Sequence, residues 1–69
     1  MKWRWEVIVK GSKDGLYHFR GRGRYKERVE CVTSLNDFMA EEMQGLLIKE
    51  GELNPTDLEV VDVTITYGR

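Results

Sequence analysis

The chain has 69 residues, a net charge of −1 and 41% hydrophobic residues. A chain of this length forms a single small domain (residues 1–69) with a thin core, and its apolar content excludes intrinsic disorder. The small net charge argues against a protein that binds nucleic acid with its whole surface.

The charges are unevenly distributed along the chain. Residues 1–30 hold nine Lys or Arg and four Asp or Glu, a balance of 9 − 4 = +5, whereas residues 31–69 hold two and eight, a balance of 2 − 8 = −6. This asymmetry predicts a molecule with one basic and one acidic side.

The single cysteine, Cys31, has no partner for an internal disulfide, and one Cys with one His cannot form a zinc site. No apolar stretch has the length of a signal peptide or a membrane span. We therefore expect a cytoplasmic protein without a membrane segment or cofactor, in which Cys31 is a buried and unreactive thiol.

Residues 2–10 (KWRWEVIVK) are predicted to form the central strand, whose core-facing side holds Trp3, Trp5, Val7 and Val9. The pair Asp14-Gly15 predicts a hairpin turn, after which a second strand begins at Leu16. The alternation continues past Gly21 and Gly23, which favours one long, kinked strand that extends to Thr33. A turn at Gly21–Gly23 is the alternative, and it would separate two strands.

Every even-numbered residue from 20 to 28 is a cation, and we call this set the basic ribbon: Arg20, Arg22, Arg24, Lys26 and Arg28. In an extended strand these side chains would lie on one face, and Arg4 would extend that face onto the first strand. The odd-numbered Phe19 and Tyr25 would then face the core. The lone His18 shares the even face and is interpreted as a surface residue rather than a catalytic one.

Ser34 followed by Asp37 has the spacing of a helix N-cap, and Gly51 is a plausible end of the helix. The acidic residues Glu50 and Glu52 are interpreted as a solvated surface. The core-facing stripe of this helix is expected to contain Leu35, Phe38, Met39, Met43, Leu46 and Leu47.

Asn54-Pro55 predicts a loop with one helical turn, and residues 58–67 (LEVVDVTITY) predict a third strand. The expected fold is α+β, with the order β-β-α-β and a mainly antiparallel sheet. It has three strands in the order 2-1-3, or four if Gly21–Gly23 is a turn. One helix is expected to cover the same face of all three strands.

The sequence lacks a nucleophile with a paired base, a pair of facing carboxylates and a complete phosphate-binding glycine motif, so we expect no enzyme. The basic ribbon with Arg4 instead predicts a binding surface. One hypothesis is a regulatory module, expected to be a homodimer, whose basic face meets an acidic protein surface or a second copy. The alternative is a nucleic-acid-binding module that contacts the phosphate backbone through the same cations.

Overall fold

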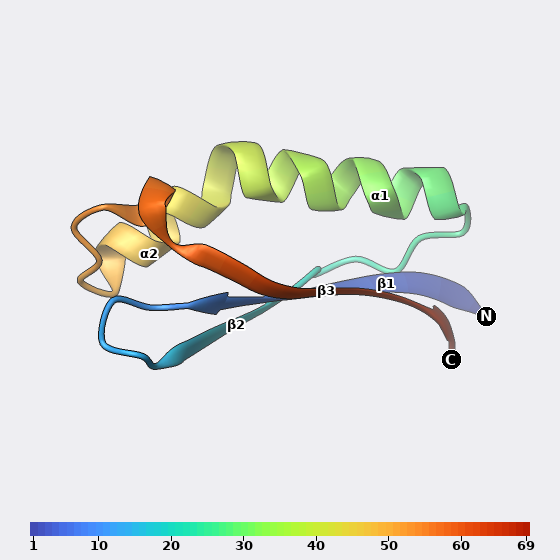
Figure 1. The fold of residues 1–69 in the computed structure, drawn as a ribbon. Helices are drawn as coiled ribbons and strands as arrows, with labels where there is room; N and C mark the ends of the chain where they lie inside the picture. The colour runs from blue at the N-terminus through green and yellow to red at the C-terminus, as the bar shows by residue number, and fades with distance from the viewer.

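A computed structural model describes residues 1–69 as a three-stranded antiparallel sheet with one long helix on one face (Figure 1). The strands are β1 (Lys2–Lys10), β2 (Leu16–Arg20) and β3 (Glu59–Gly68), in the spatial order β2-β1-β3. This confirms the predicted α+β class, the β-β-α-β order and the central position of the first strand. The molecule is elongated, 37 × 20 × 15 Å, and no helix has the length and apolar character needed to cross a membrane.

The predicted hairpin between the first two strands is confirmed. Val7 pairs with Phe19 and Val9 with Tyr17, and residues 11–15 form the connection. Asp14 adopts a left-handed conformation with φ of 63°, which Asp tolerates better than most residues. The backbone N–H of Gly11 donates to the carbonyl of Gly15 at 2.7 Å and closes the turn.

The long kinked second strand is wrong. Strand β2 ends at Arg20, and the segment up to Glu27 is a loop that reaches the sheet through a hydrogen bond from Gly21 to Trp5 and a bridge between Trp3 and Tyr25. A Cβ on Gly21 would lie 2.6 Å from the indole Nε1 of Trp5, and one on Gly23 would lie 2.8 Å from the Tyr25 hydroxyl. The two glycines therefore let the loop backbone pack closely on aromatic rings, which an alternating strand would not require.

The helix begins six residues before the predicted N-cap Ser34. Arg28–Asp37 form α1, Phe38–Glu42 form a wider π-helical turn, and Met43–Lys49 form α2, which together make one helix of 22 residues. Glu27 is the N-cap, and it forms a reciprocal capping box with Glu30. Cys31 and Leu35 are one helical turn apart and both are buried. Their packing on the sheet favours a helix here, although the alternation of side chains is typical of a strand.

The predicted core stripe of the helix is largely confirmed. Leu35, Phe38, Met43 and Leu47 are buried, Met39 is half-buried, and Leu46 is exposed. The helix ends at Lys49, and Gly51 follows with φ of 103°, a conformation that glycine adopts without strain. As expected, Asn54-Pro55 begins a single helical turn, Pro55–Asp57.

The core lies between β1 and the helix. Trp5, Val7 and Val9 of β1 are buried against the helical residues, and Trp5 contacts Phe38 with ring centroids 4.8 Å apart. The expectation that the helix covers all three strands is wrong for β3, where Val61, Val63 and Tyr67 remain 52%, 43% and 51% exposed. The helix lies over β1 and β2, where Phe38 contacts Trp5 and Phe19, so the β3 side of the sheet is left uncovered.

Candidate binding surface at the cation loop

The predicted basic ribbon does not lie on one strand face. Arg20 is the last residue of β2, Arg28 is the first residue of α1, and the three cations between them lie in the connection. We call residues 20–28 the cation loop. All five of its cations are exposed: Arg20, Arg22, Arg24, Lys26 and Arg28.

Hydrogen bonds of Gly21 and Tyr25 anchor the cation loop to the rest of the protein. Trp3 and Tyr25 exchange backbone hydrogen bonds of 2.7 and 2.9 Å, and the N–H of Gly21 donates to the carbonyl of Trp5 at 3.0 Å. The Tyr25 hydroxyl lies 2.6 Å from the hydroxyl oxygen of Ser34 on α1. These anchors reduce the conformational entropy that the loop would lose on binding a partner.

Most of the cation-loop charge is not neutralised within the molecule. Among the five cations only Arg20 has a carboxylate within 4 Å: its Nε lies 3.6 Å from a carboxylate oxygen of Glu6. Arg22, Arg24 and Lys26 have no ion pair. Arg28 places its guanidinium 5.9 Å from the ring centroid of Trp3, a cation-π contact that leaves its charge without a counterion.

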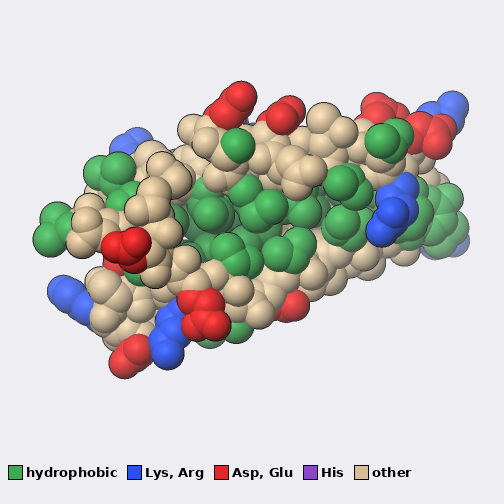
Figure 2. Space-filling model, turned by 45° about the horizontal axis from the view of Figure 1, so that its top comes forward, with side chains coloured by type: hydrophobic (Ala, Val, Ile, Leu, Met, Phe, Trp, Pro, Cys, Tyr) green, Lys and Arg blue, Asp and Glu red, His purple; other side chains and the backbone are tan.

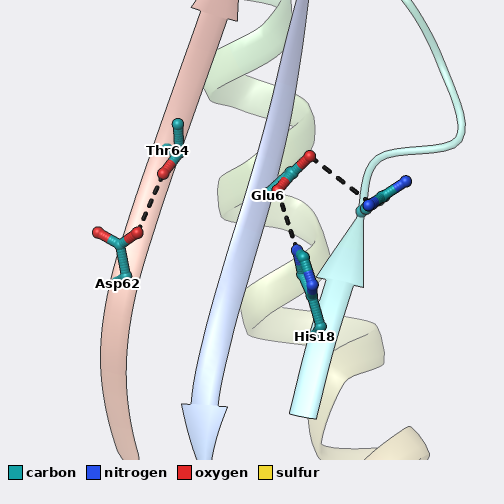
Figure 3. A network of polar contacts seen from close by, with 5 residues as sticks. Glu6, His18, Asp62 and Thr64 are labelled. Atoms are coloured by element: carbon teal, nitrogen blue, oxygen red, sulfur yellow. Dashed lines mark hydrogen bonds and ion pairs between the residues drawn. The ribbon is translucent and has the colours of Figure 1, made fainter. Parts of the chain in front are cut away.

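Glu6 forms a small polar network on the sheet face opposite the helix (Figure 3). Its carboxylate lies 2.9 Å from Nε2 of His18 and also contacts Arg20. The hydrogen bond with His18 holds the pKa of Glu6 below its ordinary value, and the positive charges of Arg20 and Arg4 act in the same direction. His18 is therefore a surface residue that hydrogen-bonds Glu6, and Arg4 lies on this same face of the sheet.

A groove of about 510 Å³ separates the start of the cation loop from the helix. Arg20 and Arg22 line one side, and three helical carboxylates line the other, while Phe19 and Tyr25 are half-buried and pack against the core. The three acids are Asp37, Glu41 and Glu42. The aromatic side chains predicted to face the core do so, and the groove brings both signs of charge together.

The sequence did not predict a second polar site, which we call the Glu52 cluster and which consists of Glu52, Ser12 and Tyr17. The sequence pattern had placed Glu52 in a solvated surface. Glu52 is buried and accepts hydrogen bonds from the backbone N–H of Ser12 at 2.9 Å, its hydroxyl at 3.3 Å and the hydroxyl of Tyr17 at 3.0 Å. The bond from the Ser12 N–H, above all, lowers the pKa of Glu52. No local sequence signal predicts it, because Ser12 and Glu52 are 40 residues apart.

The Glu52 cluster and the remaining acids do not form a metal centre, since no three His, Cys, Asp or Glu side chains gather in a metal-binding arrangement. Comparisons with protein-family models, curated proteins and solved structures give no match for this chain.

Proposed function

We propose that this protein is a small, non-enzymatic interaction module whose cation loop binds an acidic protein surface. The observation that carries the proposal is the group of free cations on an anchored loop, Arg22, Arg24, Lys26 and Arg28, none of which has a carboxylate partner. Concentrated charge of one sign on a preorganised loop favours association with the opposite charge.

An acidic protein is favoured over a phosphate backbone for two reasons. The acids Asp37 and Glu41 line the groove beside Arg22 and repel any anion placed next to them, which a phosphate backbone with a charge at every nucleotide cannot avoid, whereas the carboxylates of a protein surface can be spaced to contact the cations alone. Phe19 and Tyr25 are half-buried against the core, so little of their rings is exposed for stacking with bases.

The proposal includes a second copy of the chain as one possible acidic surface, because the helix carries Asp37, Glu41 and Glu42. A cytoplasmic location is also part of it, since the single cysteine remains a free thiol.

Titrations with three probes test the proposal: a glutamate-rich peptide, a DNA duplex and a single-stranded oligonucleotide. The test variant is Arg22→Glu/Arg24→Glu/Lys26→Glu. Its matched control is Lys2→Glu/Lys13→Glu/Lys49→Glu, which makes the same charge change at exposed residues elsewhere. We expect the wild type and the control to bind the peptide more tightly than either nucleic acid, and the test variant to lose at least tenfold in affinity.

Equal peptide binding by the two triple variants would overturn the role of the cation loop. Tighter binding of an oligonucleotide, with log K falling with log salt at a slope of about −3 to −4 for roughly four phosphate contacts, would instead favour the nucleic-acid alternative.

A further inference from the structure

Strand β3 is a long sheet edge without the usual protection against pairing with another chain. It has ten residues, whereas β2 at the opposite edge has five and carries His18 and Arg20. Natural edge strands are commonly short, charged, interrupted by Pro or distorted by a bulge. The irregularity in β3 lies near its start, opposite Ile8 and Val9, and between residues 60 and 68 only Asp62 is charged.

The backbone groups of β3 are oriented for pairing with a further strand. Trp3 and Trp5 direct backbone hydrogen bonds toward the β2 side of β1, to Tyr25 and Gly21. The backbone N–H and C=O groups of successive residues in a strand point to opposite sides. The even residues of β1 therefore form their hydrogen bonds with even residues of β3, as Arg4 does with Thr66. The N–H and C=O groups of odd β3 residues, including Val63 and Ile65, therefore point outward along the free edge.

An apolar surface adjoins this free edge. Figure 2 shows a band of hydrophobic side chains along the channel between the helix and the sheet. On the sheet side, Val61, Val63 and Tyr67 belong to β3 and are about half exposed, and Tyr67 contacts Trp3 with centroids 4.8 Å apart. The face of β3 that the helix leaves uncovered is thus an exposed apolar surface in contact with the core.

The total surface of the molecule is larger than that of a typical monomer. A folded monomer of 8.1 kDa exposes about 4,500 Å², and this chain exposes 5215 Å². The excess of about 700 Å² approaches the roughly 800 Å² that each partner buries in a stable protein interface. A second copy that covers β3 would account for this excess.

We propose that two copies of this chain pair antiparallel through their β3 strands, about a two-fold axis at Thr64. The pairing joins the two sheets into one sheet of 3 + 3 = 6 strands. In this register, Val63 of one copy forms a hydrogen-bonded pair with Ile65 of the second copy, and Tyr67 extends the pairing toward the bulge near the start of the second copy's β3. All of these side chains lie on the helix side, so the two apolar bands become continuous and buried.

Charge disfavours the registers whose two-fold axis lies closer to Asp62. With Thr64 at the axis, Asp62 lies opposite Thr66 of the second copy, and the two Asp62 residues are about 14 Å apart along the strands. An axis at Val63 would bring them to about 7 Å and an axis at Asp62 would place them face to face, where like charges repel. With Thr64 at the axis, Arg4 and the Asp62 of the other copy also flank one Thr66, so opposite charges attract.

The oligomeric state tests the interface. Sedimentation equilibrium from micromolar to millimolar protein should show the wild type shifting from 8.1 kDa to 2 × 8.1 = 16.2 kDa. Val63→Lys should remain at the lower mass, and Leu16→Lys, the same kind of change at an exposed residue on the opposite edge, should form dimers like the wild type. A wild type that stays monomeric at millimolar concentration, or two variants that behave alike while folded, would overturn the proposal.

Disulfide crosslinking tests the register and does not depend on the folding of Val63→Lys. Thr64→Cys would face itself across the axis in a pair without backbone hydrogen bonds, with Cα atoms about 4.5 Å apart, a separation that a disulfide spans. Thr66→Cys keeps Asp62 in place and would lie about 14 Å from its copy, too far for a disulfide, and the native Cys31 is buried. Mild oxidation should therefore crosslink Thr64→Cys at least tenfold faster, and equal rates would overturn the register.

This interface is independent of the cation loop. The triple variant Arg22→Glu/Arg24→Glu/Lys26→Glu should lose binding to the acidic peptide and still form dimers, so each proposal can fail without the other.

Discussion

The indole Nε1 of Trp5 donates a hydrogen bond to the hydroxyl oxygen of Ser34 across the interface between β1 and the helix, at 3.2 Å. The same oxygen lies 2.6 Å from the hydroxyl of Tyr25, the aromatic residue at which the cation loop bridges to β1. Ser34 thus joins the central strand, the helix and the cation loop, instead of capping the helix as its spacing to Asp37 suggests.

Ser34→Ala should lower the free energy of unfolding by about 1–2 kcal/mol, because Trp5 and Tyr25 both lose a hydrogen-bond partner in a partly buried site. Urea unfolding followed by Trp fluorescence measures this change. Thr33→Ala is the matched control: it removes a hydroxyl from the neighbouring exposed residue of the same helix and should change stability by less than about 0.5 kcal/mol. Equal effects of the two variants would contradict the role assigned to Ser34.

Gly21→Ala and Gly45→Ala should change stability in opposite directions. A Cβ on Gly21 would overlap the ring of Trp5, so the loop must shift, at a cost of about 1–3 kcal/mol. A Cβ on Gly45 meets nothing within 4 Å, and in a helix it should stabilise by about 0.5–1 kcal/mol. Thermal unfolding of the two variants beside the wild type measures both signs, and a stabilised Gly21→Ala would show that the close packing on Trp5 is not required.

Glu52→Gln should reduce the dependence of stability on pH in acid. The pKa of Glu52 is lower in the folded state than its ordinary value of 4.5, so its contribution is present above about pH 4.5 and is lost as the pH falls through the folded pKa. The melting temperature of the wild type should therefore drop more steeply between pH 5 and pH 3, by several degrees, than that of Glu52→Gln. Glu50→Gln changes an exposed neighbour and should show the same dependence of melting temperature on pH as the wild type. If Glu52→Gln also keeps the wild-type dependence, the role assigned to Glu52 is contradicted.

Cys31 should react with a thiol reagent only after unfolding. It is fully buried in α1, and burial raises the pKa of its thiol above the ordinary value, so both access and the thiolate fraction are small. Labelling with an aromatic disulfide reagent should be at least a hundredfold slower in native buffer than in denaturing urea. Thr33→Cys provides an exposed thiol on the same helix as a positive control for the reagent, and rapid native labelling of Cys31 itself would mean that the helix opens readily.

The sequence by itself determined the elements whose signals are local. Side-chain alternation in residues 2–10 and 58–67 predicts two strands, Asp14-Gly15 predicts the hairpin turn, and the apolar stripe from Leu35 to Leu47 predicts most of the helix. These signals depend on one segment and on which of its faces is buried, and β1, β3 and the helical core confirm them.

Only the tertiary structure decided the conformation of residues 21–33 and the surroundings of Glu52. The cations from Arg20 to Arg28 alternate as a strand would, but Gly21 and Gly23 pack on Trp5 and Tyr25, and Cys31 is buried as part of a helix. Glu52 is buried because Ser12 and Tyr17, far away in sequence, supply its hydrogen bonds. Local propensity differs little between strand and helix for such a segment, so long-range packing and hydrogen bonding determine which one forms.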